Sequence, residues 1–596
     1  MSLLQTNKAL KFLCFSALFL LFAGQALYLA ATNSTVSDEV AHIGAGYSYL
    51  KYNDLRLNPE HPPLVKQMAA LPLLFMNLKF PLETPAWKET EQWAAGRAFL
   101  FTLGNPAEKI IFRARAALLP LALLMALLIF FWTRDLFGES AAFFSLFLYS
   151  FFPEMIIHAS LVTTDFAPAT FYFGIFYFLF RFVRTGNFKN IYLAGLAIGL
   201  AIASKYSTFA ALPLLYVFSF WYAFAIFPER SSIRGQAEKI ACPLMNISRV
   251  PLWLMILITV FVVSHKKSFP IFSLPLLYLW LSRFLPAKSR LQNPQMLRAM
   301  KLLLILLSVA FLVILVIYFE PASWFRHMRM DPFKRFFRGW SIFRDHSVSS
   351  PHPSFLFGEF STKGWWYYYL IAMLVKIPAP ILLLFFLGFS HLIFSKKSVR
   401  PEIFLLVIPP VFYWAIASFV NKVNIGVRHI LIVYPFLLVI AGAAFEFLGQ
   451  SKFRKIRPFV IGLSALWLIT TSALAFPNYL SYFNGLPGLL GKKETILGDS
   501  NISWGQDLKR LKIWMEQNRI AEIYRLLNFN FPEELDYYKI NYTKGDSMLH
   551  FQRKDSGYYA VDMFTYQALV SKSEFLWLKT IQPVAHIGGS ILIYRF

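Results

Sequence analysis

Cysteine and charged residues are both scarce in this sequence. Only Cys14 and Cys242 are present among 596 residues, so neither a disulfide framework nor a cysteine metal site is supported. Charged residues make up 15% of the chain and hydrophobic residues 57%, which is too apolar for a soluble globular protein. The composition therefore predicts a polytopic α-helical membrane protein.

Acidic residues are fewer than basic ones, at 32 against 58, which gives a formal net charge of +26. The Lys and Arg residues fall in short clusters between apolar runs, a pattern typical of membrane topology signals and not of a nucleic-acid groove. We therefore expect membrane lipids and no nucleic acid as partners. If the amino terminus is cytoplasmic, the clusters share one side of the membrane: "RTGNFKN", "PERSSIRGQAEK", "PAKSRLQNPQMLRAMK", "SKKSVRPE" and "GQSKFRKIRP".

Apolar segments that approach the length of a membrane crossing recur about 13 times. The first, Leu10–Leu29, has no convincing cleavage site after it, so we expect an uncleaved anchor. Two short segments between Val250 and Leu285 also suit a re-entrant hairpin. The other expected spans are Ala116–Phe131, Ala141–Ile157, Phe166–Phe182, Ile191–Ala203, Phe209–Phe227, Leu302–Tyr318, Trp366–Phe394, Ile403–Val420, Ile430–Leu448 and Phe459–Phe476.

The composition becomes that of a soluble protein after Pro477. Segments "ETILGDS" and "IAEIYRLLNF" favour strands, and "WGQDLKRLKIWMEQN" between them favours an amphipathic helix. The alternation continues to the last residue, which indicates a small α/β domain. We therefore expect a membrane domain over residues 1–476, with external loops at 31–112 and 320–364, and an external soluble domain over residues 477–596.

The first external loop carries ionisable residues directly beside a membrane helix. It contains two amphipathic stretches, Val40–Leu50 and Pro63–Phe75, which we expect to lie in the membrane interface above a cavity. Asp38 and Glu39 open the first stretch. Such groups are tolerated near the bilayer mainly where they pair or line a cavity, which makes them candidates for a functional site. A helix cap is the alternative for Asp38.

Further charged residues lie at the ends of expected spans. Asp165 follows two threonines at the head of an apolar helix, as a cap or as part of the cavity. Lys205 and Arg428 lie at external helix ends. There they could bind a phosphate, or alternatively extend to lipid headgroups. Lys376 lies inside a span and needs a polar partner there. The segment Trp324–His346 mixes arginine with aromatic residues, as an interfacial helix or a gate over a lipid-linked ligand.

Several blocks of sequence, in order along nearly the whole chain, resemble one family. They are the acidic pair followed by "EHPPL", then "ASLVTTDFAPATFYF", "LAGLAIGLAIASKYS", "GEFSTKGWWYYYLIAMLVKIPAP", "NIGVRHILIVYPF", and "PNYLSYFNGLPG" with "GDSNISWGQDLKRL". Together they resemble the GT-C class of integral membrane glycosyltransferases, related to protein O-mannosyltransferases and lipid A aminoarabinose transferases. The last three blocks are similar to a bacterial, phospholipid-carrier-dependent subgroup near family 39. Ser503 stands where that subgroup has an acidic residue.

The resemblance implies a GT-C fold and an inverting transfer of a hexose or pentose. The donor would be an undecaprenyl- or dolichyl-phosphate-type sugar, and the acceptor a protein, lipid A or another glycan. The site would lie on the periplasmic or extracellular face of a bacterial cytoplasmic (inner) membrane. Such a transfer needs a base for the acceptor proton and cations for the leaving phosphate.

We expect Asp38 to act as the base, with its neighbour Glu39 as the second choice. Repulsion between adjacent carboxylates suits one of them to this work. The residues expected to bind the substrate are Asp165, Lys205, Lys376, Arg428 and Arg56.

The resemblance also implies a divalent metal, Mg, Mn or Zn. Glu60 would hold it against the lipid phosphate, with His61 or His429 completing the site through an imidazole nitrogen. The alternative is that Glu60 and His61 pair with Arg56 or Lys66 at the membrane surface.

Three other functions stay open at this point. A transporter or flippase of lipid-linked glycans would have many spans, but transporters tend to show repeated halves and polar interruptions near the midplane. A lipid-linked glycan ligase or polymerase would use Arg and His from a late external loop, as Trp324–His346 provides. In a non-catalytic binding protein, the carboxy-terminal domain would be the active part.

Overall fold

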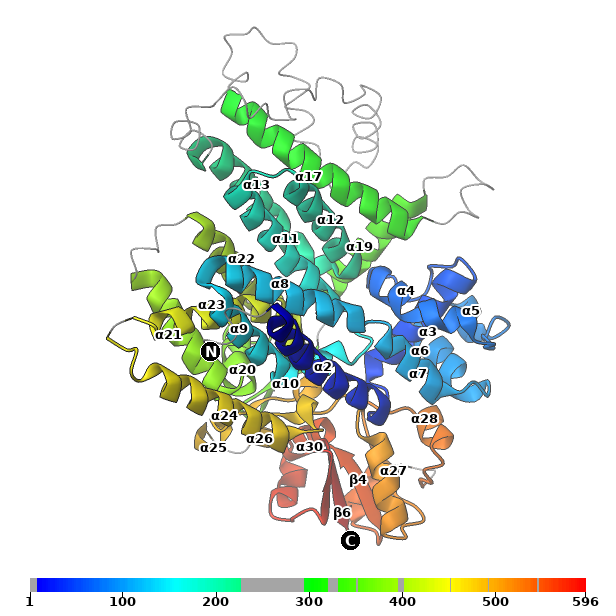
Figure 1. Cartoon of the computed structure of the whole chain (residues 1–596). Helices are drawn as coiled ribbons and strands as arrows, with labels where there is room; N and C mark the ends of the chain where they lie inside the picture. Colours follow the sequence, from blue (N-terminus) through cyan, green and yellow to red (C-terminus); the bar gives the residue numbers. More distant parts are fainter. Residues whose placement is uncertain are drawn as a thin grey trace.

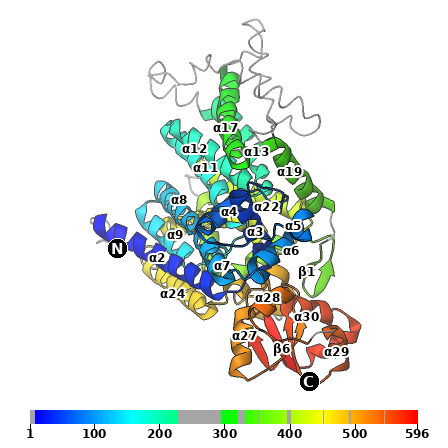
Figure 2. The ribbon, with the colours of Figure 1, turned by 90° about the vertical axis from the view of Figure 1, so that its right-hand side faces the viewer.

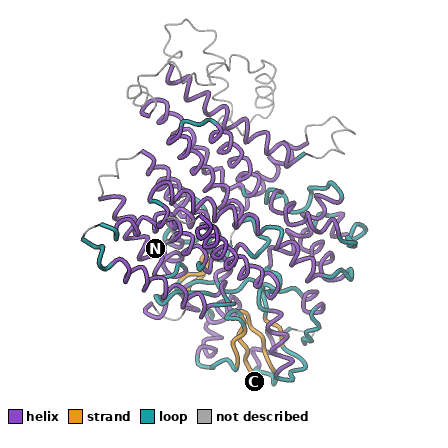
Figure 3. Tube along the Cα trace, in the orientation of Figure 1, coloured by secondary structure: helices purple, strands orange, loops and turns teal. Residues whose placement is uncertain are grey.

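The computed structural model describes residues 8–226, 294–319, 331–349, 352–394, 401–450, 452–490, 493–543 and 546–596. Long helices form most of it, and a small unit with a β-sheet lies at the carboxy-terminal end (Figure 1). Strands are concentrated in that unit, as the orange segments of Figure 3 show. The helices of the first polar loop, α3 to α7, lie together on one flank of the helical bundle (Figure 1).

Within these ranges, seven helices are long and apolar enough to cross a membrane, and up to nine if two bent pairs each count as one span. This confirms the helical membrane protein, but about 13 spans are not reached in the described ranges. The predicted segments between Val250 and Leu285 lie outside the described residues. The seven are α2 (Lys8–Thr32), Ala107–Phe137 with α7 (Ala107–Ala116) and α8 (Leu119–Phe137), α11 (Phe166–Thr185), Tyr206–Ala225 with α13 (Ala211–Trp221), α17 (Pro294–Tyr318), Val427–Phe447 with α23 (Tyr434–Phe447), and α24 (Arg457–Ala475).

Two predicted straight spans are broken. Segment Ala141–Ile157 divides into α9 (Glu139–Ser150) and α10 (Pro153–Ala159), bent by 66°, and Trp366–Phe394 divides into α20 (Tyr368–Lys376) and α21 (Ala379–Phe394), bent by 113°. A proline stands at each break, and proline removes a helical hydrogen bond and disfavours helix in the residue before it. Two further apolar helices, α12 (Lys189–Ser204) and α22 (Pro401–Phe419), have apolar stretches too short to count among the seven.

Helix α3 (Ser37–Lys51) is not the interfacial helix that its sequence predicts. All its residues from Glu39 to Tyr49 are buried, because two neighbouring helices, α4 (Leu64–Ala70) and α6 (Gln92–Arg97), close over it. Glycine makes this approach feasible: a Cβ on Gly46 would lie 2.1 Å from the Lys66 carbonyl oxygen, and one on Gly44 would lie 3.1 Å from the Gly96 Cα. Helix α3 is therefore fixed on several sides.

The expected segment Trp324–His346 contains a helix in its described part, α19 (Asp331–Ser349). Its Trp340 ring packs edge-on against Phe209 at 4.8 Å between centroids. A Cβ on Gly339 would lie 2.2 Å from the Tyr206 hydroxyl and 2.4 Å from the Pro59 carbonyl oxygen. Helix α19 therefore packs closely on the bundle and on the first loop.

The carboxy-terminal unit contains a four-stranded sheet in the order β3 (Tyr524–Leu526), β4 (Tyr558–Asp562), β6 (Ile591–Arg595), β5 (Ala585–Ile587). Strand β3 is parallel to β4, and the other pairs are antiparallel. Alternate residues of β4 enter separate apolar clusters, Tyr559 in one and Ala560 in the other, so both faces of the sheet are covered. The small α/β unit agrees with the sequence.

One predicted strand in this region is wrong. Segment "ETILGDS" forms the short helix α26 (Lys493–Ile496) and the turn η10 (Asp499–Asn501). Only Leu497 makes a strand-like bridge, to Leu356, and Asp499 has a φ of +53°, which interrupts an extended backbone.

The remaining short elements connect these parts. They are η1 (Leu71–Phe75), α5 (Pro85–Lys88), η2 (Ala98–Thr102), η3 (Tyr206–Ala210), η4 (Tyr222–Ile226), β1 (Ser354–Leu356), β2 (Glu359–Ser361), η8 (Val427–Val433), η9 (Tyr479–Ser481), α25 (Pro487–Leu490), α27 (Leu508–Gln517), α28 (Pro532–Tyr537), α29 (Ser547–Arg553), α30 (Met563–Val570) and η11 (Ser573–Lys579).

The segment 34–37, which leads into α3, is hydrogen-bonded to the carboxy-terminal unit. The Ser34 N–H donates to the Gln506 carbonyl and the Ser37 N–H to the Trp504 carbonyl, each at 3.0 Å. The Thr35 hydroxyl donates to the Glu534 carboxyl group. In Figure 2 this unit lies directly below the helices of the first loop. The start of α3 and the carboxy-terminal unit are therefore one packed region.

Candidate active site

Asp38 lies in the first turn of α3 and pairs with Arg428 at the start of η8. Arg428 Nη1 lies 2.8 Å from Asp38 Oδ2 and 3.6 Å from Asp165 Oδ2. The Asp38 side chain is 22% exposed and that of Arg428 11%. Asp38 does not cap its helix, because Val36 stands at the N-cap position and donates its N–H to the Glu39 side chain. The carboxylate is thus partly open and held beside a cation.

Glu39 does not share this environment. Arg115 binds it with two hydrogen bonds, Nε to Oε1 at 2.8 Å and Nη2 to Oε2 at 2.6 Å, and both side chains are 0% exposed. Glu39 also accepts the N–H groups of Val36 and Val162. Because every approach to this carboxylate is taken, the structure does not support its prediction as a second catalytic choice. It ties α3 to α7 and to the loop before α11.

Asp165 and Lys205 form a second ion pair next to Arg428. Lys205 Nζ lies 2.6 Å from Asp165 Oδ1, and the Asp165 side chain is 0% exposed. Asp165 makes no side-chain cap for α11. Burial opposes its charge, but Lys205 and Arg428 hold the pKa of Asp165 well below its ordinary value. Asp165 is therefore an ionised group between two cations.

Histidines surround this group of charges. The rings of His42 and His61 meet edge to face at 5.3 Å, and His42 Nδ1 donates to the Val162 carbonyl at 2.9 Å. Burial lowers the pKa of both rings, so both are neutral near pH 7. Among the described residues, His61 Nδ1 and His429 Nε2 are buried without a hydrogen-bond partner. These nitrogens are free to bind a polar ligand.

The predicted metal ligands do not come together. In the part of the chain that the structure describes, no group of three or more His, Cys, Asp or Glu side chains could hold an ion. Glu60 Oε1 instead accepts the side-chain amides of Asn58 and Gln92, at 3.0 Å and 2.7 Å. In the described part of the chain, Glu60 is thus engaged by two amide groups.

The alternative prediction pairs Glu60 and His61 with Arg56 or Lys66. In the structure, Lys66 binds backbone carbonyl groups of this loop, including that of His61. Lys66 Nζ donates to the carbonyl groups of Asn58 and His61, at 2.7 Å and 2.8 Å, and to the Tyr49 hydroxyl at 2.8 Å. Burial lowers the pKa of Lys66 to about 7, against the opposing charge of Glu60. Lys66 thus fixes the turn that presents the His61 ring.

Two predicted substrate-binding residues lie elsewhere. Arg56 pairs with Asp54 at 2.8 Å, is 45% exposed, and stacks over Trp87, so it does not join the Asp38 group. Lys376 Nζ lies 2.8 Å from Glu154 Oε1 and is 0% exposed. It also donates to the carbonyl groups of Leu480 and Asn501. Lys376 is therefore buried and held by one carboxylate and two carbonyl groups, away from the Asp38 group.

Replacing Lys376 by Met is expected to lower the free energy of unfolding by about 3–5 kcal/mol, because it removes the cation beside the buried Glu154 and leaves that carboxylate with the His158 ring, 3.4 Å away. The double variant Lys376→Met, Glu154→Gln is expected to recover part of this loss. Thermal unfolding in detergent, with Arg56→Met as a surface control, measures both effects. An unfolding midpoint of Lys376→Met equal to that of the wild type would contradict a structural role for this pair.

The sequence did not identify the part of the site that the carboxy-terminal region contributes. The Ser500 hydroxyl accepts Arg428 Nε at 3.1 Å, and the Arg428 guanidinium lies over the Trp504 ring, 4.2 Å from its centroid. The Asn501 side chain accepts the Val427 N–H at 3.0 Å. These residues belong to the "GDSNISWGQDLKRL" block, which is part of the family resemblance. Its sequence alone does not indicate that it contacts Arg428.

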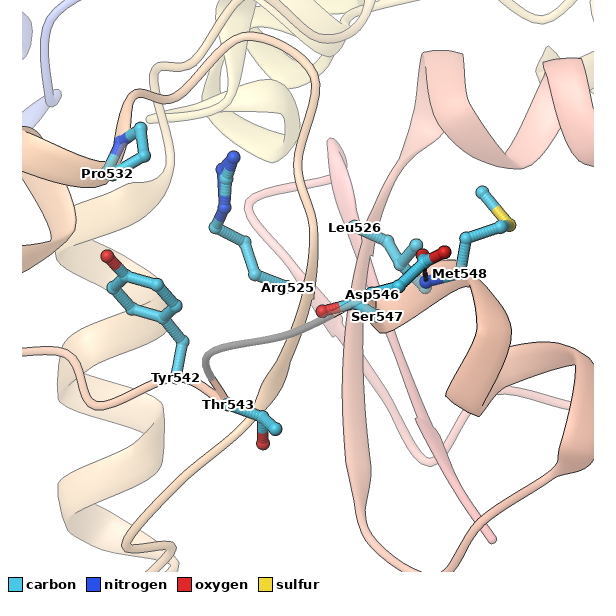
Figure 4. Close-up of a pocket in the computed structure, with 8 residues that line it drawn as sticks. All are labelled: Arg525, Leu526, Pro532, Tyr542, Thr543, Asp546, Ser547 and Met548. Carbon is cyan, nitrogen blue, oxygen red and sulfur yellow. Dashed lines mark hydrogen bonds between the residues drawn. The ribbon is translucent and has the colours of Figure 1, made fainter.

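A separate cavity of about 330 Å³ lies in the carboxy-terminal unit. Figure 4 shows Pro532 and Tyr542 on one side of Arg525 and Met548 on the other. Asp546, which also lines it, caps α29 by accepting the Met548 N–H at 3.0 Å. None of the residues predicted for the site lines this cavity.

The site thus draws on three parts of a polytopic helical membrane protein. The first loop gives Asp38, the bundle gives Asp165, Lys205 and Arg428, and the carboxy-terminal block gives Ser500 and its neighbours. Residues 98–236 match the family model described as dolichyl-phosphate-mannose-protein mannosyltransferase. This match includes Asp165 and Lys205 and confirms the resemblance to membrane glycosyltransferases related to protein O-mannosyltransferases. No curated protein matches the chain.

Two solved membrane proteins are similar to the whole chain at low identity. ArnT from Cupriavidus metallidurans, bound to undecaprenyl phosphate, is 13% identical, with 98% of each chain covered and a TM-score of 0.43. The oligosaccharyltransferase AglB from Archaeoglobus fulgidus, in complex with an inhibitory peptide and a dolichol-phosphate, is 12% identical. It covers 98% of this chain and 74% of its own, with a TM-score of 0.39.

Proposed function

We propose that this protein is an inverting glycosyltransferase of the GT-C class that uses a polyprenyl-phosphate-linked sugar. The observation that carries the proposal is one buried group in which Asp38 meets Arg428, and Arg428 and Lys205 both meet Asp165. Transfer from a phosphate leaving group requires a base for the acceptor proton and cations for the phosphate. This group contains the carboxylate of Asp38 beside Arg428, and Lys205 close to Arg428 through Asp165. The family model that matches residues 98–236 describes enzymes with a donor of this kind.

Arg428 and Lys205 are the groups that would receive the donor phosphate. One ammonium proton of Lys205 is directed to Asp165, and Arg428 uses Nη1 and Nε for Asp38 and Ser500. An ammonium has three N–H donors and a guanidinium five, so both cations have donors left for phosphate oxygens. The unpartnered His61 and His429 nitrogens border the same space.

The donor phosphate competes with Asp38 for Arg428. When the guanidinium turns to the phosphate, Asp38 Oδ2 loses its 2.8 Å partner and is free to accept a proton. The acceptor O–H then gives this proton to Asp38, and the acceptor oxygen bonds to the anomeric carbon from the opposite side to the phosphate. The bond between that carbon and the phosphate oxygen breaks, and Arg428 and Lys205 stabilise the charge on the departing polyprenyl phosphate.

The finer assignments are part of the same proposal. The transferred sugar is a hexose or pentose, the carrier is of the undecaprenyl or dolichyl type, and the acceptor is a hydroxyl group of a protein, lipid A or another glycan. The reaction takes place on the external face of a bacterial cytoplasmic membrane, which the distribution of basic loops in the sequence supports.

Transfer of radiolabelled sugar by the purified protein in lipid vesicles tests the proposal. A panel of undecaprenyl- and dolichyl-phosphate sugars is offered with envelope extracts as acceptors, and label that leaves the carrier is counted. We expect transfer from at least one donor. A flippase would move label across the vesicle wall while the sugar stays on its carrier, and that outcome would overturn the proposal.

The variant Arg428→Met is expected to weaken binding of polyprenyl phosphate by about tenfold to a hundredfold, because one charge-assisted hydrogen bond contributes about 1.5–3 kcal/mol. The matched control is Arg56→Met, which removes an exposed arginine of the first loop that pairs with Asp54 and stacks over Trp87. Binding is measured by titrating a polyprenyl phosphate into the protein in detergent. Equal losses in the two variants would contradict a phosphate role for Arg428.

A further inference from the structure

Asp499 lies beside the proposed site, on the turn η10 between the last membrane helix and the carboxy-terminal unit. It is 7% exposed, and its φ of +53° is a left-handed conformation that Asp and Asn adopt more readily than other residues. The Ser500 N–H donates to Asp499 Oδ1 at 2.6 Å. The carboxyl group is therefore fixed by its own backbone and is not a flexible surface group.

The residues after Asp499 connect it with Arg428. Ser500 accepts the Arg428 Nε, and Trp504 lies under the guanidinium. The Ser500 hydroxyl is itself fixed, because it donates to the Ile425 carbonyl at 2.7 Å. The turn that carries Asp499 thus forms one side of the space around Arg428.

Helix η8 packs against the turn η10, and ionisable groups of three elements interact electrostatically with the Asp499 carboxyl group. Arg428 comes from η8, Asp38 from α3 and Tyr368 from α20. Burial raises the pKa of Asp499 to about 7, Asp38 adds to this rise, and Arg428 and the Ser500 N–H oppose it. Asp499 therefore gains or loses its proton close to neutral pH.

We propose that Asp499 is a third carboxyl group of the donor site and that it takes up a proton when the anionic donor binds. This inference rests on the proposed function. With neutral histidines, Arg428 and Lys205 balance Asp38 and Asp165, so an ionised Asp499 gives the group one net negative charge. An incoming phosphodiester would add a second negative charge next to it. Protonation of Asp499 removes that repulsion, and its O–H becomes a donor to the phosphate or the sugar.

The test follows donor affinity with pH. The probe is a polyprenyl-phosphoryl sugar, a phosphodiester whose own charge stays constant between pH 6 and 9. Each bound donor takes up at most one proton at Asp499, so the wild-type affinity is expected to fall by about tenfold or more from pH 6 to pH 9. The variant Asp499→Asn, an uncharged carboxamide of the same shape, is expected to bind at pH 9 nearly as tightly as the wild type at pH 6.

Two further variants keep this test decisive. Asp499→Gly also suits the positive φ and is used if the Asn variant does not fold. Asp507→Asn is the matched control, since burial also raises the pKa of Asp507 but its carboxylate binds Arg510 and Ser590 instead of Arg428. Lys66 titrates in the same range, and any pH dependence that it causes stays in all three variants.

The outcomes separate this inference from the proposed function. If the wild type binds no polyprenyl-phosphoryl sugar at any pH, the proposed function fails. If the wild type binds the donor and Asp499→Asn keeps the full wild-type fall in affinity, the role of Asp499 is overturned. The role of Asp499 is supported if donor affinity no longer decreases from pH 6 to pH 9 in Asp499→Asn but still decreases in Asp507→Asn.

Discussion

The variant Asp38→Asn is expected to lower the turnover of sugar transfer about a thousandfold, because a positioned general base contributes about 10²–10⁴ to a rate. Its affinity for the donor is expected to stay equal or to rise. Arg428 loses the carboxylate that lies 2.8 Å away and is then free for the phosphate. A loss in turnover without a loss in binding is the signature of a residue that acts on the acceptor proton.

Single-turnover transfer of labelled sugar, together with titration of the polyprenyl phosphate, measures the two effects separately. Asp54→Asn serves as the control, because it removes an acidic group of the same loop that pairs with the exposed Arg56. Turnover of Asp38→Asn within threefold of the wild type would exclude Asp38 as the base. The search would then move to the other carboxylates around Arg428.

The neighbouring variant Glu39→Gln is expected to act on stability, with a loss of about 3–5 kcal/mol in the free energy of unfolding. Both side chains are 0% exposed, so the substitution leaves Arg115 as a buried cation without its carboxylate partner. The double variant Glu39→Gln, Arg115→Met removes both charges and is expected to lose less than the sum of the single changes.

Thermal unfolding in detergent measures these losses. The Asp54→Asn variant again provides the comparison, because exposed pairs contribute about 0–1 kcal/mol. If Glu39→Gln unfolds at the wild-type temperature but loses turnover, Glu39 takes part in the chemistry and the buried-pair account is wrong. Two adjacent carboxylates with opposite phenotypes would show that burial, and not residue type, divides their roles.

Much of the site was visible in the sequence because its residues lie at ends of apolar segments. The cost of placing charge beside a bilayer points to Asp38 and Asp165, and Lys205 and Arg428 are candidates as cations at external helix ends. The structure brings the four together although Asp38 and Arg428 are 390 positions apart. The same reasoning also selected Lys376, for which a polar partner was required. In the structure that partner is Glu154.

The parts that the sequence did not reveal depend on long-range packing. Nothing in the local pattern distinguishes Asp38 from Glu39, because the difference comes from Arg115, 76 positions away. Helix α3 looked amphipathic, and only the glycine contacts with α4 and α6 show why it is buried. Asp499 lies in a segment whose alternation suggested a strand, and its positive φ comes from a turn that hydropathy does not encode.

The hydrogen bonds between the segment 34–37 and the carboxy-terminal unit have a consequence for biogenesis. Asp38 is translated long before Ser500 and Trp504, which contact its partner Arg428. A chain that has not yet reached this block therefore inserts its earlier helices before Arg428 has the contacts that hold it beside Asp38.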